Sequence, residues 1–116
     1  MTESSPLSAS LEELFLGRVR ALPEDTQMLV LLAAADSSGE PALVRRAAER
    51  LRIGINAASA PGVDQLLSFE PRIAFRLPLI RSAVYKGASL QARRQAHTAL
   101  AAATDRSSTA IVAHGI

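Results

Sequence analysis

The 116-residue sequence predicts a single, mainly helical domain with one short β-hairpin, followed by two further helices. Hydrophobic residues make up 48% of the chain and aromatic residues only 3%, so the core must be built from Leu, Ile, Val and Ala, which suits close-packed helices. Apolar residues also recur at helical spacing through most of the chain. Only residues 67–76 show apolar residues that alternate, as they do in strands.

The first predicted helix runs from Ser10 to about Leu22. Ser10 and Glu13 have the spacing of a capping box, in which each side chain satisfies a free amide of the first turn. One stripe of this helix is apolar and consists of Leu11, Leu14, Phe15, Val19 and Leu22. Residues 1–7 precede the cap, and we expect them to be disordered.

Two more helices are predicted before the hairpin. Pro23 suits a first helical position, and the acidic pair after it suits the first turn, so a helix should run to about Ala35. Its segment 28–35 is apolar on every side, which predicts a position at the centre of the domain. A third helix, from about Glu40 to Leu51, should turn Leu43, Val44, Ala47, Ala48 and Leu51 inward.

Residues 53–62 read as a connection with one irregular turn, and Val63–Leu67 as a short helix. Residues 67–69 and 73–76 are then the two strands of the hairpin. Pro78 should start a helix that ends near Gly87. Ser89 should cap a last helix that runs from Leu90 to about Ala103. Beyond it, residues 105–116 lack a helical period, and we expect a tail that is disordered or unlike the rest of the domain.

Several classes of site are excluded or disfavoured by residue counts. The chain has no cysteine and only two histidines, so disulfides and thiolate zinc sites are excluded and we expect no metal or other cofactor. The apolar run 28–35 is too short to span a bilayer, and the N-terminus lacks the basic start of a signal peptide. We therefore expect a cytoplasmic protein that does not associate with membranes.

Charge is distributed unevenly along the chain. Residues 1–40 contain two basic and seven acidic groups, whereas residues 41–116 contain eleven basic and four acidic groups, a balance of +7. Such asymmetry can indicate nucleic-acid binding. A solvated, arginine-rich helix surface explains the same count, and the sequence favours that explanation.

Three helices, a hairpin and further helices are the order of a winged-helix unit with a helical appendage. On this interpretation residues 8–76 form the winged-helix-like segment and residues 77–104 the appendage. Four stretches also resemble, in order and spacing, the segment that follows the ATPase core in large ATP-binding regulators of the LuxR family. They are FLGRVRALPEDTQ, LLAAADSSGEPALVRRAAERL, LLSFEPRIAFRLPLIRSAVY and RRQAHTALAAATD.

The resemblance implies a part of a signal-transduction ATPase, with one departure. The family typically has a histidine, placed to sense bound nucleotide, where this chain has Leu77. Leucine cannot donate a hydrogen bond to a phosphate, so the sensing role does not carry over. No GxxxxGK[ST] loop occurs in the sequence, and we expect no nucleotide binding. The family's DNA-binding helix-turn-helix would lie beyond Ile116.

The tail suggests a second interpretation of the chain. Family members often continue after this helix with a run such as DRRAWH. Codons natural to a GC-rich genome for residues 110–116 would encode that run in another reading frame. The chain can therefore be explained as a remnant of a frameshifted gene without a function of its own.

Three functional hypotheses follow. The favoured one is a truncated, stand-alone piece of such a regulator, acting as a protein-interaction module through self-association or binding to a related regulator. The alternative is DNA binding by the winged helix, with Arg72 and Arg76 as phosphate contacts. The sequence argues against specific readout, because the expected recognition helix offers only Asp64 and Gln65. An enzyme is not expected, since no nucleophile has an evident partner.

Overall fold

Five α-helices and one two-stranded hairpin make up the part of the chain that the structure describes. The structure is a computed structural model that describes the backbone of residues 6–115 and the side chains of residues 9–104. The helices are α1 (Pro6–Arg20), α2 (Glu24–Ala35), α3 (Pro41–Arg50), α4 (Pro78–Gly87) and α5 (Leu90–Gly115). Between α3 and α4 lie two 3₁₀ turns, η1 (Ile55–Ser59) and η2 (Val63–Gln65), and the strands β1 (Leu67–Ser68) and β2 (Ala74–Phe75). The predicted mainly helical class with a single short hairpin is confirmed.

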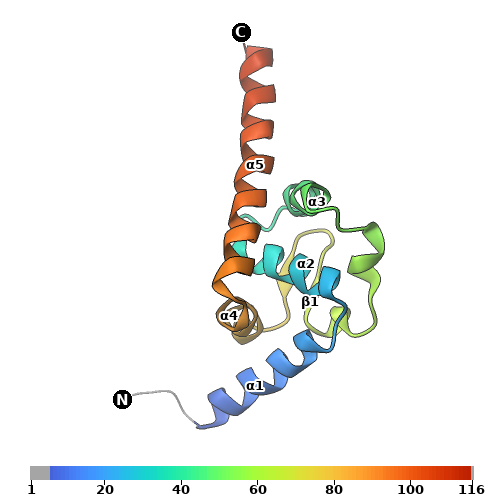
Figure 1. Cartoon of the computed structure of the whole chain (residues 1–116), viewed down its shortest axis with the longest axis vertical. Coiled ribbons are helices and arrows are strands. Elements are labelled where there is room, and N and C mark those ends of the chain that lie inside the picture. The colour runs from blue at the N-terminus through green and yellow to red at the C-terminus, as the bar shows by residue number, and fades with distance from the viewer. Residues whose placement is uncertain (1–5, 116) are drawn as a thin grey trace.

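Helix α2 is the centre of the core, as its uniformly apolar sequence predicts. All six residues from Leu29 to Ala34 are buried, and α2 packs against α3, α4 and α5, which surround it in Figure 1. Thr26 is only 1% exposed, and its hydroxyl donates to the carbonyl of Ala57 at 2.9 Å. This bond fixes η1 against α2 and satisfies a polar group that would otherwise be costly to bury.

Helix α3 ends in a left-handed residue that is not glycine. Arg52 has φ 61°. Its amide donates to the Glu49 carbonyl at 3.0 Å, and the Ile53 amide donates to the Ala48 carbonyl at 3.0 Å. This is the Schellman pattern, which closes the helix and buries Ile53 against its last turn. An arginine in this conformation costs about 1 kcal/mol relative to a residue without a Cβ atom.

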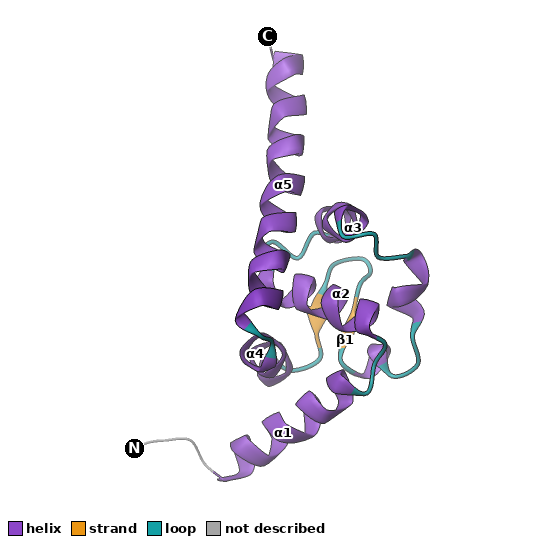
Figure 2. Cartoon of the chain, in the orientation of Figure 1, coloured by secondary structure: helices purple, strands orange, loops and turns teal. Residues whose placement is uncertain are grey.

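The hairpin is shorter than predicted. Its two antiparallel strands pair Leu67 with Phe75 and Ser68 with Ala74, and Figure 2 shows the strands in orange. The predicted short helix at 63–67 is wrong in part: residues 63–65 form the 3₁₀ turn η2, and Leu67 already belongs to β1. Leu67 is buried in the core and pairs with Phe75 across the two strands. This cross-strand pair favours an extended backbone at Leu67.

Helices α4 and α5 confirm two predicted helix starts. Pro78 begins α4, which ends at Gly87 as predicted. Ser89 caps α5, because its hydroxyl accepts from the Ala92 amide at 3.0 Å. The predicted end near Ala103 is wrong, since α5 continues to Gly115 and projects past the rest of the domain (Figure 1). No glycine or proline interrupts residues 90–114, so the helix can continue after its apolar period ends.

Helix α1 differs from its prediction at the start. It begins at Pro6, and Ser10 lies inside the helix rather than at its cap. Residues 6 and 7, predicted to be disordered, are therefore helical, while residues 1–5 lie outside the described residues. Proline is well suited to a first helical turn, which explains the earlier start. Leu14 was expected on the buried stripe but is 48% exposed. None of the helices within the described residues combines the length and hydrophobicity needed to cross a membrane.

The packing of α1 on α4 depends on a glycine. A Cβ atom on Gly87 would lie 2.4 Å from Cδ1 of Leu16, so the Leu16 side chain of α1 occupies the space that a side chain at position 87 would need. We expect Gly87→Leu to lower the free energy of unfolding by about 1–3 kcal/mol, the usual cost of overpacking, in a urea titration.

Gly17→Ala is the matched control. Gly17 lies within α1 with no atom near its missing Cβ, so alanine there should raise the free energy of unfolding by about 0.5–1 kcal/mol. A Gly87→Leu protein as stable as the unsubstituted chain would contradict the packing of α1 on α4.

Candidate functional site

The loop between α2 and α3, residues 36–40, is folded around the carboxylate of Asp36. This side chain accepts from the Ser38 amide at 3.2 Å and from the Gly39 amide at 3.0 Å. It also accepts from the Ser38 hydroxyl at 3.0 and 2.9 Å. Asp36 is 9% exposed, and these bonds satisfy its buried carboxylate.

Arg81 of α4 closes the C-terminal end of α2. Its Nε donates to the carbonyl of Ala34 at 3.0 Å, and its Nη2 donates to the carbonyl of Asp36. The last carbonyls of a helix have no partner within the helix and carry its partial negative charge. A half-buried guanidinium at this point therefore supplies both the missing donors and the favourable charge.

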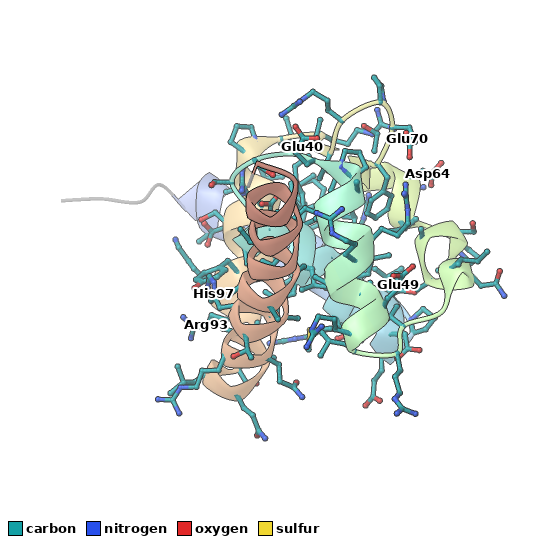
Figure 3. All side chains as sticks on the ribbon, turned by 90° about the horizontal axis from the view of Figure 1, so that it is seen from above. Glu40, Glu49, Asp64, Glu70, Arg93 and His97 are labelled. Atoms are coloured by element: carbon teal, nitrogen blue, oxygen red, sulfur yellow. The ribbon has the colours of Figure 1, made fainter. Side chains whose placement is uncertain are left out.

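The hairpin is tied to the same loop. Arg72 donates from Nη2 to the carbonyl of Ser38, and its Nη1 lies 3.4 Å from a carboxylate oxygen of Glu40. The amide of Ile73 donates to the Gly39 carbonyl at 3.0 Å. Gly39 has φ +75°, and a Cβ there would lie 3.3 Å from Nη2 of Arg72. Figure 3 shows Glu40 and Glu70 on this side of the molecule.

The two arginines predicted to contact phosphate make intramolecular bonds and contact different neighbours. Arg72 bonds to the α2–α3 loop, whereas Nε of Arg76 donates to the carbonyl of Asp64 in η2 at 2.9 Å. The expected recognition helix is the three-residue turn η2, where the side-chain oxygen of Gln65 accepts from Arg18 at 3.2 Å. Both arginines are solvent-exposed, but their guanidinium groups position the hairpin and η2.

Leu77, which the sequence resemblance singled out, directly precedes α4. It has an extended backbone and is 46% exposed, so a large apolar side chain faces solvent one turn before Arg81. The leucine side chain has no group that can donate or accept a hydrogen bond.

Tyr85 and His97 form a polar contact between α4 and α5. The phenol oxygen lies 2.8 Å from Nε2 of His97, and the two rings meet edge to face. The Arg93 guanidinium lies over the tyrosine ring, 5.3 Å from its centre. His97 is exposed, as predicted, and Figure 3 shows it with Arg93 on the side of α5 that faces away from α3. The pair therefore fixes α4 against the outer side of α5.

A hollow of about 470 Å³ opens where α1, α2, α4 and α5 meet, and we call it the helix-junction hollow. Its apolar lining consists of Leu16, Val19, Met28, Leu31, Leu51, Ile53, Val84, Ala88 and Ala92, of which Val19, Leu31, Ile53 and Val84 are buried. Its charged lining is Arg20 from α1 with Glu24 and Asp25 from the first turn of α2. A concave apolar floor with a few charges at its edge is suited to binding an apolar side chain or helix.

A second, shallower groove runs between α3 and α5, and we call it the α3–α5 groove. It has a volume of about 380 Å³. Arg50 contributes one wall and Arg94 the other, with polar residues of α5 between them. Leu51 and Gln95 line both hollows, so the two are adjacent on one face of the molecule.

The two adjoining hollows are candidate binding surfaces. No group of three or more His, Cys, Asp or Glu side chains within the described residues could hold a metal ion. The histidine is bonded to a phenol, and the buried Asp36 carboxylate is satisfied by loop amides and a hydroxyl.

The capping role of Arg81 predicts a stability effect. Arg81→Met keeps the apolar stem but removes both donors from the end of α2, so we expect the free energy of unfolding to fall by about 1–3 kcal/mol. Chemical denaturation of the full chain measures this change.

Arg72→Met is the matched control for this substitution. It removes an exposed guanidinium that contacts the same loop from the hairpin. We expect the free energy of unfolding to fall by less than about 1 kcal/mol. Equal effects of the two substitutions would contradict a special role for Arg81.

Comparison with known proteins gives no relative for this chain: no protein-family model matches it, and no curated protein or solved structure is significantly similar.

Proposed function

We propose that this chain is a non-catalytic interaction module of the kind found in LuxR-type ATP-binding regulators, and that it works by binding protein. The single observation that carries the proposal is the helix-junction hollow, a concave surface with an apolar floor on an otherwise well-packed helical body. A concave surface that combines apolar side chains with a few charged groups is the usual form of a binding site.

The four stretches that resemble the regulator family agree with this proposal. In that family the corresponding segment packs against an ATPase and passes on its nucleotide state. The hollow is built from α1, α2, α4 and α5, which contain most of those four stretches. In a complete regulator of that family, such a surface would contact the neighbouring ATPase domain. In a separate chain it is free to bind another protein.

Leu77 supports binding without nucleotide sensing. It stands where the family has histidine, and its apolar side chain has no group that could bond a phosphate. Its exposure of 46% adds apolar surface at the start of α4. An exposed leucine can pack against an apolar surface of a partner protein, but it offers a nucleotide phosphate no hydrogen-bond donor.

Direct DNA binding has less support. Phosphate contacts need cationic groups that are free to reach the backbone. Arg72 and Arg76 instead bond to main-chain carbonyls of the protein, and η2 is too short to enter a groove as a recognition helix. The proposal therefore predicts no sequence-specific complex with duplex DNA.

The direct test uses a LuxR-type regulator from which the segment resembling this chain has been deleted. We expect the full 116-residue chain to melt cooperatively and to bind this regulator with a dissociation constant on the order of micromolar, as measured by calorimetry.

Ala92→Glu places a carboxylate on the floor of the hollow and should weaken binding at least about tenfold, because an unpaired charge is costly to bury. Ala101→Glu makes the same change at an exposed position of α5 and should leave binding unchanged. A chain that does not melt cooperatively would favour the gene-remnant interpretation. Failure to bind the regulator, or tight binding to one DNA sequence, would contradict the proposal.

A further inference from the structure

The face that carries both hollows has opposite charges at its two ends. In the helix-junction hollow, Glu24 and Asp25 outnumber the one cation, Arg20. In the α3–α5 groove the charged groups are Arg50 and Arg94, both cationic. The face therefore runs from a net negative end to a positive end across the shared residues Leu51 and Gln95.

The charged side chains at the two ends of this face make no pairs among the described residues. Glu24, Asp25, Arg50 and Arg94 are all exposed, and none makes a side-chain hydrogen bond or ion pair with another described residue. Other exposed charges do pair, as Arg45 does with Glu70 at 3.7 Å and Lys86 with Glu12 at 3.7 Å. Charge on this face is therefore available to a partner.

An exposed apolar side chain lies beside the same face. Leu90 is 58% exposed at the start of α5. Its neighbours in the chain, Ser89 and Gln91, line the helix-junction hollow and the α3–α5 groove respectively. A large side chain at this border can enter a concave apolar floor on another molecule and lose its contact with water.

A second copy of the chain meets all of these requirements. If two such faces meet about a two-fold axis near Leu51 and Gln95, the acidic end of each lies against the basic end of the other. In a two-fold interface every contact occurs twice, so one pairing of opposite charges is doubled. The same arrangement brings Leu90 of each copy toward the apolar floor of its partner.

We infer that the chain forms a two-fold symmetric dimer through this face, with Glu24 and Asp25 of one copy against Arg50 and Arg94 of the other. This inference deepens the proposed protein-binding function and rests on it, because it names the partner as a second copy. The complementary charges set the antiparallel orientation of the two copies. The apolar lining of the helix-junction hollow supplies apolar surface that is buried between them.

Charge reversal tests the orientation. The full chain is expected to sediment at twice its 12.3 kDa mass at low ionic strength, with weaker association at high salt. Asp25→Lys and Arg94→Glu each place like charges together twice, so each should weaken the dimer at least about tenfold. Thermal melts establish that both variants are folded.

Mixing the two variants separates charge pairing from structural damage. In a heterodimer of Asp25→Lys with Arg94→Glu, the introduced lysine of one copy faces the introduced glutamate of the other, and the unchanged Asp25 faces the unchanged Arg94. Each contact is again between opposite charges, so the mixture should recover the association that each variant lacks alone. Glu13→Lys and Arg45→Glu, which change exposed charges outside the two hollows, should dimerise normally.

The outcomes distinguish this inference from the proposed function. A monomer at every concentration that still binds the segment-deleted regulator overturns the dimer and leaves the proposed function intact. A dimer that is insensitive to both reversals, or a mixture that is not restored, overturns the two-fold arrangement. Loss of regulator binding with an intact, charge-dependent dimer contradicts the regulator relationship alone.

Discussion

The C-terminal end of α2 lies inside the molecule, where its carbonyl groups have to be satisfied by the protein. Residues 28–35 of α2 are apolar on every side and covered by neighbouring helices, so this end of the helix does not face water. Arg81 reaches two of its carbonyls from α4, while Asp36 folds the loop that follows. Arg72 joins the hairpin to that loop. Three segments far apart in the sequence are thus positioned by one helix end.

The opposite end of α2 contributes to the proposed binding surface. Its first turn supplies Glu24 and Asp25 to the helix-junction hollow, and the next turns supply Met28 and Leu31 to the floor. Helix α4 likewise has Arg81 in the capping network and Val84 in the hollow. A partner seated in the hollow therefore contacts the same two helices that the capped loop holds in place. The capping network makes the hollow a preformed surface, which reduces the ordering cost of binding.

Local patterns were sufficient for much of the fold. Pro78 and Ser89 fixed two helix starts, and the apolar run 28–35 identified the central helix, because these signals act within one turn. The continuation of α5 beyond Ala103 was not predicted. Apolar residues stop recurring at helical spacing there, but this change alone does not end a helix. The partners of Arg72, Arg76 and Arg81 could not be predicted, since main-chain carbonyls are present everywhere in a sequence. The loop of Asp36 had a local signal, an Asp-Ser-Ser-Gly turn.

Amide hydrogen exchange of the full chain at low and high protein concentration tests the account most directly. We expect the amides of residues 29–34 in α2 to exchange slowest at both concentrations, because these residues form the core of one cooperative unit. We also expect residues 51–53 and 89–95 to become further protected at high concentration, where the copies associate. Rapid exchange in α2, or protection that does not change with concentration on that face, would contradict a rigid body that presents this surface to a second copy.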